Sequence, residues 1–400
     1  MAGQLRYLWC HSATDAATAD WHRNLLARRR ERGFAIEHFC VTPPELGPRW
    51  LHFPDLDRRW RAGEPRLLAM YERLAEAIAG CDVLVHFNGA NLHPRFMEQV
   101  RCRKIYVCAD DPESSEILSR PVAYAYDLQL VQNIACVDLY RSWGLRNVRF
   151  WPLGSQLGEE RITLTDQQIL DPATRPVPVI YHGERNDRRR ARLDALQQAF
   201  PAAVCRGHGW PAGYADEAEP GATYQRARIG WNVHNSTGPV NFRTYDLPAH
   251  GVLQICDNRT HLGRLFAPGE EVVGFDTIAE AIALTHHYLA HPDEQRRIAL
   301  AGHRRWRQDY TPDRIWDRLV GHAEELHAGK DAVQASSPLL IAGLATHHRR
   351  TRLRRMLWRG ARLAAACGLP LRLGARLWRR LRQPRHPVRA EHPAQERIGR

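Results

Sequence analysis

The sequence predicts an α/β protein of two units, each built on a parallel sheet. Short apolar runs alternate with longer segments of helical periodicity, a pattern typical of parallel sheets covered by helices. The polar stretch 156–178, which holds three prolines, interrupts this alternation. We therefore expect an N-terminal domain over residues 1–155, a linker over 156–178, a second domain over 179–328 and a tail over 329–400.

The elements expected in the first domain follow the alternation in order. Apolar, β-branched or aromatic runs predict strands, and segments that end at glycine predict helices. Strands are expected over residues 6–10, 35–41, 82–87, 104–108, 127–132 and 148–151, and helices over 16–32, 64–79 and 94–100.

The second domain repeats the pattern. Leu193, Leu196 and Phe200 stand at helical spacing in the helix expected over residues 188–200. A further short helix is expected after Asn241, ended by Gly251. The remaining strands are expected over 179–183, 229–234, 252–256 and 271–275, and the remaining helices over 277–290, 293–309 and 311–326.

The charge of the chain is concentrated in its tail. Apolar residues make up 44% of the 400 residues and charged residues 25%, which suffices for a full core. Residues 349–400 hold 16 arginines, no lysine and two acids, a net of +14 against +13 for the whole chain. The preceding residues are therefore close to neutral, so nucleic acid is not an expected partner of the folded body.

Cysteine usage and the first residues bear on compartment and metal content. The nine cysteines include no CxxC pair, and most lie in apolar runs, as buried thiols of a reducing compartment do. No signal-peptide core or membrane-spanning apolar stretch is evident. We expect a cytoplasmic protein without a cofactor or a bound metal.

Residues 241–271 predict a site for a ligand that is both phosphorylated and hydroxylated. The start of a helix offers free N–H groups to a phosphate, and Arg243 in its first turn offers a bidentate fork. Asp246 offers a carboxylate to a sugar hydroxyl, and Asn241 is a favoured helix cap. The alternatives are that Asn241 only caps the helix and that Arg243 pairs with Asp246.

The same region carries a family resemblance. The motifs are NFRTYDLPAHG (241–251) and FAPGEE (266–271), together with YHGERNDRR (181–189), GHGWP (207–211) and YQRARIGWN (224–232). Over about residues 179–320 the chain resembles the CgeB-like (spore maturation protein-like) bacterial glycosyltransferases of the GT-B superfamily. The resemblance implies two Rossmann-like domains facing across a cleft, with a nucleotide-sugar donor on the second domain and an acceptor on the first.

Two positions depart from the pattern of these relatives. The family's usual acid is glutamate, and here it is Asp246. Wider retaining relatives carry another glutamate eight residues earlier, where this chain has Gly238. Sugar-nucleotide binding is therefore a firmer expectation than catalysis.

Further donor-binding residues follow from the aligned motifs. Gly183 ends a strand and lets the ligand approach the backbone, while Arg185 and Arg188 face the diphosphate. Trp210 either stacks on the base or plugs the domain surface. Glu271 is either a donor contact or a turn acid, and the run of arginines at 188–190 is otherwise a solvated helix face.

The N-terminal domain offers two candidates for a catalytic base, His86 and Asp110. Both stand at or just after the end of a predicted strand, where an acceptor hydroxyl needs a base or a hydrogen-bond partner. The alternative is that they are polar residues that cap neighbouring helices. GT-B enzymes are usually metal-independent, so cationic side chains are expected to stabilise the leaving diphosphate.

The basic tail and the body together leave three classes of function. Residues 349–382 predict a basic amphipathic helix on an anionic membrane, with a disordered tail as the alternative. The first class is a glycosyltransferase with a glycan, lipid-linked or protein acceptor. The others are a non-catalytic GT-B relative that binds a nucleotide or glycan, and an interaction protein held at membranes.

Overall fold

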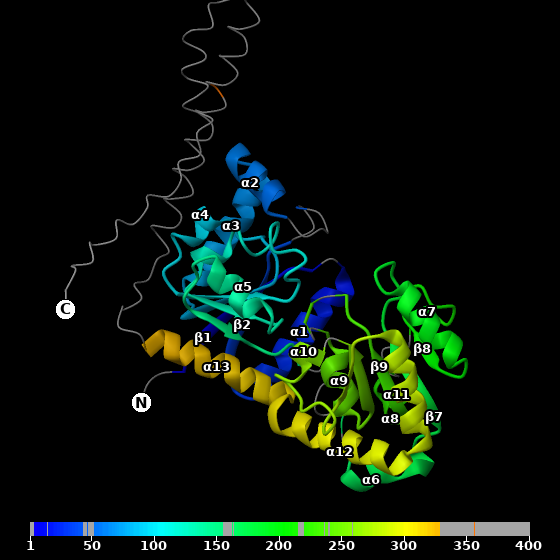
Figure 1. Ribbon diagram of the computed structural model, residues 1–400. Helices are drawn as coiled ribbons and strands as arrows, with labels where there is room; N and C mark the ends of the chain where they lie inside the picture. Colours follow the sequence, from blue (N-terminus) through cyan, green and yellow to red (C-terminus); the bar gives the residue numbers. More distant parts are fainter. Residues whose placement is uncertain are drawn as a thin grey trace, which may run out of the picture.

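The computed structural model describes residues 4–13, 15–42, 46, 52–154, 162, 164–214, 220–235, 237–238, 241–257, 259–328 and 356. They form two α/β domains side by side, each with one parallel sheet (Figure 1). The predicted fold class is confirmed. The predicted membrane-contacting segment, 349–382, lies outside the described residues apart from Met356. Within the described ranges, no helix has the length and apolarity to cross a membrane.

The N-terminal sheet has six parallel strands in the order β2-β1-β3-β4-β5-β6. The strands are β1 (Arg6–His11), β2 (Ala35–Cys40), β3 (Val83–Phe87), β4 (Arg103–Cys108), β5 (Leu128–Val131) and β6 (Val148–Phe150). The helices are α1 (Ala16–Glu31), α2 (Phe53–Ala62), α3 (Pro65–Ile78), α4 (Pro94–Met97) and α5 (Cys136–Ser142), with a 3-10 turn η2 (Ala123–Ala125). All six predicted strands are present, whereas α2 and α5 are additions to the prediction.

The C-terminal sheet has five parallel strands in the order β11-β10-β9-β7-β8. The strands are β7 (Val177–His182), β8 (Val204–Arg206), β9 (Ala227–Asn232), β10 (Leu253–Asp257) and β11 (Val273–Phe275). The helices are α7 (Arg190–Ala199), α8 (Pro220–Gln225), α9 (Arg243–Ala249), α10 (Arg259–Leu262), α11 (Ile278–Ala290) and α12 (Pro292–Asp309). Because all strands are parallel, their carboxyl ends share one edge of the sheet.

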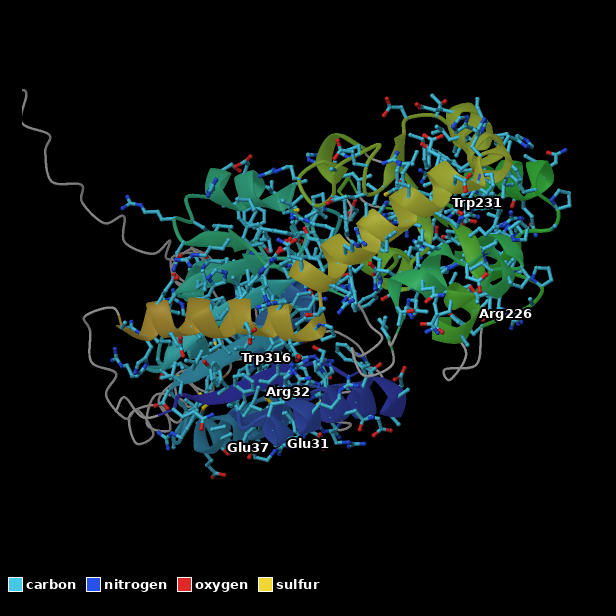
Figure 2. The ribbon with its side chains drawn as sticks, turned by 90° about the horizontal axis from the view of Figure 1, so that it is seen from below. Glu31, Arg32, Glu37, Arg226, Trp231 and Trp316 are labelled. Carbon is cyan, nitrogen blue, oxygen red and sulfur yellow. The ribbon has the colours of Figure 1, made fainter. Side chains whose placement is uncertain are left out.

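Helix α13 (Pro312–Ala328) packs on the N-terminal sheet rather than on the second domain (Figure 1). Trp316 lies 5.8 Å from Trp9 between ring centroids, and it is drawn on α13 in Figure 2. The Asp313 carboxylate accepts from the buried Arg29 of α1 at 2.5 Å. The predicted second domain, 179–328, therefore ends in a helix that packs on the first domain, since the chain crosses back at residue 312.

The described residues of the predicted linker include regular elements. The linker contains α6 (Asp166–Leu170) and the 3-10 turn η4 (Pro172–Thr174), and β7 begins within it. Ile169 of α6 is buried in the core of the C-terminal domain, and Asp166 pairs with Arg304 of α12 at 2.5 Å. Residues 166–178 thus belong to the second domain.

Candidate functional site

The turn after β7 is built around a glycine, Gly183, that lies against two side chains. Gly183 has φ +158°, and a Cβ there would overlap the Arg243 guanidinium and lie 3.1 Å from the Tyr181 hydroxyl. Gly207 in turn packs against the Gly183 carbonyl, where a Cβ would overlap it. The missing side chain of Gly183 therefore makes room for Arg243 at the carboxyl edge of the sheet, and that of Gly207 lets the two turns pack closely.

Arg243 is anchored at this edge by neutral acceptors and is 8% exposed. Its guanidinium carbon lies 4.9 Å from the centre of the Tyr181 ring. It donates to Asn232 Oδ1 (3.3 Å), the His182 carbonyl (2.9 Å) and the Val233 carbonyl (3.3 Å). A guanidinium held by uncharged acceptors keeps its full positive charge available to an anion.

Arg189 is a further candidate for binding an anion, although the sequence favoured a solvated helix face for it. It is 7% exposed and donates from Nη1 to the Val233 carbonyl at 3.3 Å. Its buried Nε has no hydrogen-bond partner among the described residues. Burial lowers the pKa of Arg189, and the nearby Arg243 lowers it further. The run of three arginines gave no sign of which one turns inward.

The positive charges of Arg189 and Arg243 are only partly balanced by nearby acids. Arg189 and Arg243 share one carbonyl, and among the described residues the acid within ion-pair reach of either is Glu184, 3.9 Å from Arg189 and half exposed. Two like charges that lie close together in a largely buried environment repel each other strongly, and a bound anion relieves this repulsion. The arrangement is suited to a phosphate or diphosphate.

Among the described residues, Arg189 and Arg243 donate to the Val233 carbonyl, whereas the two arginines predicted to bind the diphosphate, Arg185 and Arg188, do not. Arg185 pairs with Asp194 at 2.6 Å and lies over the Trp210 ring, 5.5 Å from its centroid. Arg188 is exposed just before α7. Both stand close to the Gly183 turn in the chain, but Arg189 rather than Arg188 reaches the end of β9.

Trp210 is buried in the core of the C-terminal domain. Its indole N–H donates to the Gly183 carbonyl at 2.9 Å, and its ring packs against Tyr181. Of the two interpretations left open by the sequence, this geometry matches the plug, because a buried ring already covered by neighbours has no free face for a base.

Asn241 caps α9, as one of its predicted roles requires. Its Oδ1 accepts from the Thr244 N–H at 3.0 Å, and its Nδ2 donates to Asn232 Oδ1 at 2.8 Å. The Thr244 N–H, one of the groups predicted to bind a phosphate, is therefore already hydrogen-bonded to Asn241. Asp246 lies in the first turn of α9 and is 5% exposed, so it presents little carboxylate surface to a ribose.

A buried polar cluster lies beneath this edge. His234, Cys256 and Asp257 form one group of possible metal ligands within the part of the chain that is described. The Asp257 carboxylate, however, accepts from His234 Nδ1 at 2.6 Å, from the His234 backbone N–H and from Arg192 at 2.9 Å. Burial lowers the pKa of His234 despite this carboxylate. The hydrogen bonds already saturate Asp257, so the group acts as a clamp between β9, β10 and α7.

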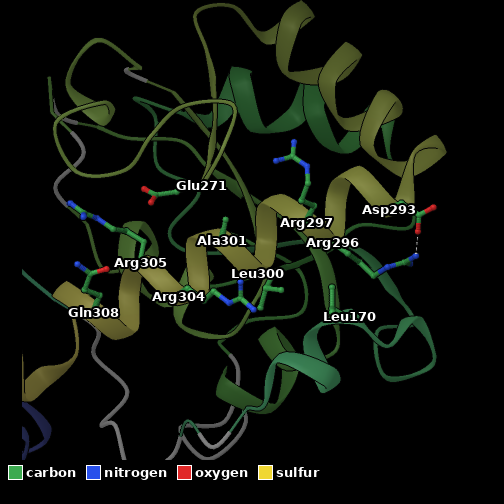
Figure 3. Close-up of a pocket in the computed structure, with 10 residues that line it drawn as sticks. All are labelled: Leu170, Glu271, Asp293, Arg296, Arg297, Leu300, Ala301, Arg304, Arg305 and Gln308. Carbon is green, nitrogen blue, oxygen red and sulfur yellow. Dashed lines mark hydrogen bonds and ion pairs between the residues drawn. The ribbon is translucent and has the colours of Figure 1, made fainter.

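Glu271 lies away from the other predicted donor residues. It precedes β11, at the amino edge of the sheet, and its Oε2 accepts from the Ala267 N–H at 2.8 Å. A Cβ on Gly302 of α12 would overlap the Glu271 carbonyl, which explains a glycine inside that helix. Glu271 lines a hollow of about 540 Å³ on α12 (Figure 3), with Leu170, Asp293, Arg296, Arg297, Leu300, Ala301, Arg304, Arg305 and Gln308.

The two N-terminal candidates differ in access. His86 is fully buried on β3, its Nδ1 lies 2.6 Å from the Tyr126 hydroxyl, and burial lowers its pKa to about 3. Asp110 follows β4 and is exposed, with its Oδ2 accepting from Asn88 Nδ2 at 2.7 Å. Asp110 is therefore the candidate that a substrate can reach.

Known proteins share this fold. Residues 187–321, which include Arg189, Val233 and Arg243, match the glycosyl transferase-like family. HepE of Anabaena in complex with UDP is similar with a TM-score of 0.58, at 11% identity over 80% of this chain and 100% of that chain. Sucrose-phosphate synthase of Thermosynechococcus elongatus is similar with a TM-score of 0.58, at 13% identity over 81% of this chain and 100% of that one.

An alpha-glucosyltransferase in complex with UDP and a 13-mer DNA containing a HMU base is also similar, with a TM-score of 0.56 at 10% identity over 80% of this chain and 100% of that chain. The sequence matches no curated protein. The chain has the GT-B glycosyltransferase fold. The narrower CgeB-like resemblance stays a prediction.

Proposed function

We propose that the protein is a glycosyltransferase that takes a sugar from a nucleoside-diphosphate donor. The observation that carries the proposal is the pair of nearly buried guanidinium groups, Arg189 and Arg243, on the Val233 carbonyl. The family match over residues 187–321 supports it, as do structural neighbours with bound UDP and with UDP-glucose.

In this proposal the diphosphate lies at the carboxyl edge of the C-terminal sheet, beside Gly183. Charge that develops on the leaving diphosphate is stabilised by Arg189 and Arg243, without a metal ion. The Nε of Arg189 supplies one donor that no described protein group uses. Arg185 and Arg188 follow the same turn in the chain, and Asn241 shares Asn232 Oδ1 with Arg243. These three residues complete the proposed donor-binding set.

In the same proposal the acceptor binds to the N-terminal domain. Asp110 is the proposed base, because it is exposed at the carboxyl end of β4 and is already hydrogen-bonded to Asn88. The acceptor is a glycan, a lipid-linked sugar or a protein. A lipid-linked acceptor is favoured if the arginine-rich segment 349–382 binds anionic membranes, each arginine contributing ~1 kcal/mol.

Liposome flotation tests whether segment 349–382 binds anionic membranes. The full chain and a chain ending at Lys330 are compared on vesicles with and without anionic lipid. Flotation of the full chain alone supports the membrane contact, and equal partitioning of both contradicts it.

Release of nucleoside diphosphate from a panel of donor sugars tests the function itself. Turnover that Arg243→Lys reduces at least about tenfold supports the proposal, because a lysine keeps the charge but loses the three-way anchoring. Arg304→Lys on α12 is the control and is expected to leave turnover unchanged. Full activity in Arg243→Lys contradicts the placement of the donor.

A non-catalytic GT-B protein that binds a nucleotide is the second candidate. The observation that favours it is Gly238, where retaining relatives carry a glutamate. Nucleotide binding without release of diphosphate from any donor selects this alternative.

A further inference from the structure

Gly238 of the C-terminal domain lies directly against Asn133 of the N-terminal domain. A Cβ at residue 238 would overlap Asn133 Oδ1, and it would lie 2.9 Å from Asn133 Cγ and 3.2 Å from Nδ2. Real Cβ atoms do not approach other atoms this closely, so any side chain at 238 requires Asn133 to move. The two domains thus meet at a contact between an amide and a Cα.

The Asn133 amide is not free to move aside. It is 1% exposed and follows β5. Its Nδ2 donates to the Asp111 carbonyl at 3.1 Å, and its Oδ1 accepts from the Ala135 N–H at 3.1 Å. Rotating the amide away would break both of these hydrogen bonds, which is costly at a buried side chain.

Ile134, the residue after Asn133, also contributes to the contact between the two domains. Ile134 is buried in a cluster that includes Tyr245 and Ala249 of α9, and Phe266 and Tyr310 of the C-terminal domain. Consecutive residues of the N-terminal domain therefore contact both the turn before α9 and the surroundings of α9. The helix so held carries Arg243 at its first position.

We propose that Asn133 is a positioning residue that sets the donor arginine from the opposite domain. Gly238 precedes the cap Asn241 by three residues, and Asn241 binds the Thr244 N–H beside Arg243. Because residue 238 and the cap are so close along the chain, a shift at 238 is expected to displace Asn241 as well. The inference rests on the proposed function for its ligand, but the contact between the domains does not.

The same contact explains the glycine where retaining relatives have a glutamate. An acidic side chain at 238 and the Asn133 amide cannot occupy the same space. Position 238 therefore serves domain contact in this chain.

The test uses Gly238→Ala in the full chain, with Gly321→Ala of α13 as the control because a Cβ there meets no atom within 4 Å. UDP affinity and hydrogen exchange of peptides over residues 128–135 and 241–249 are measured. We expect UDP affinity to fall about tenfold and exchange in both peptides to rise about tenfold in Gly238→Ala, with neither changing in Gly321→Ala.

Removing the partner side chain sharpens the test. Asn133→Gly combined with Gly238→Ala is expected to bind UDP within about threefold of Asn133→Gly alone, since the overlap is gone. Wild-type exchange in Gly238→Ala, or a double variant no better than the sum of the two single losses, overturns the inference. If the wild type binds no nucleoside diphosphate, the proposed function fails, and hydrogen exchange still decides whether the contact couples residue 238 to α9.

Discussion

Arg189 and Arg243 donate to the same oxygen, the Val233 carbonyl, at 3.3 Å each. The two side chains come from different helices, one from the start of α7 and the other from the start of α9. A carbonyl can compensate only part of two positive charges, so the pair gains from a bound dianion. Gly183 leaves space for the Arg243 guanidinium, and Gly207 leaves space for the Gly183 carbonyl.

Replacing Gly183 with alanine is expected to displace Arg243. The new Cβ overlaps the guanidinium, and overpacking of this kind costs about 1–3 kcal/mol. Urea unfolding and UDP binding should both weaken. Gly80→Ala is the matched control, because a Cβ there lies 3.7 Å from its neighbour and fits. Unchanged binding in Gly183→Ala would separate the glycine from the donor site.

Trp210→Ala is expected to destabilise the protein in the absence of any nucleotide. A buried tryptophan lost from a core costs about 3–5 kcal/mol, here with the hydrogen bond to the Gly183 carbonyl. Tyr214→Ala, an aromatic residue that is 73% exposed four positions on, should change stability by less than about 0.5 kcal/mol. A Trp210→Ala variant of normal stability but weak nucleotide binding would restore the stacking interpretation.

Trp316→Ala tests whether α13 is part of the N-terminal domain. Trp316 packs on Trp9 of β1, so its loss should lower the free energy of unfolding by about 3–5 kcal/mol. Hydrogen exchange should quicken first in β1 and α1. Arg314→Ala on the exposed side of the same helix is the control. Faster exchange confined to the C-terminal sheet would contradict this packing.

Stability is expected to fall on acidification between about pH 6.5 and pH 4. Burial lowers the pKa of His11 and His250 to about 4 and that of His22 and His86 to about 3. The unfolded chain, with histidine pKa values near 6.5, binds more protons than the folded chain in this window, so unfolding becomes more favourable as the pH falls. The urea midpoint should therefore be lower at pH 5 than at pH 7.5. Equal midpoints would mean that these rings are solvated.

The sheets could be predicted from the sequence because their strands are short apolar runs bounded by turn residues. Strands such as β3 are apolar on both faces apart from a single histidine, so their signal is strong. The edge strand β8 has three residues, too few for a pattern. The placement of α13 could not be predicted, because an apolar helix face does not specify which sheet it covers.

The centre of the candidate site could be chosen from the sequence, and its borders could not. Arg243 and Gly183 stand in the motifs that drew attention to this region. Arg189 could not be distinguished from Arg188 and Arg190, because its inward direction depends on α7 beginning at residue 190. Glu271 shares a sequence block with Asp246, yet the strand β10 between them carries it to the opposite edge of the sheet.

Equilibrium binding of UDP to Arg189→Gln and Arg190→Gln tests the central claim most directly. Arg190 is the next residue along the chain, exposed and paired with Asp187 at 3.1 Å, so its substitution matches the change in charge. Loss of a charge-assisted hydrogen bond costs about 1.5–3 kcal/mol, which predicts binding weaker by roughly 10- to 100-fold in Arg189→Gln and unchanged in Arg190→Gln. Equal affinity in the two variants would contradict a donor site at the Val233 carbonyl.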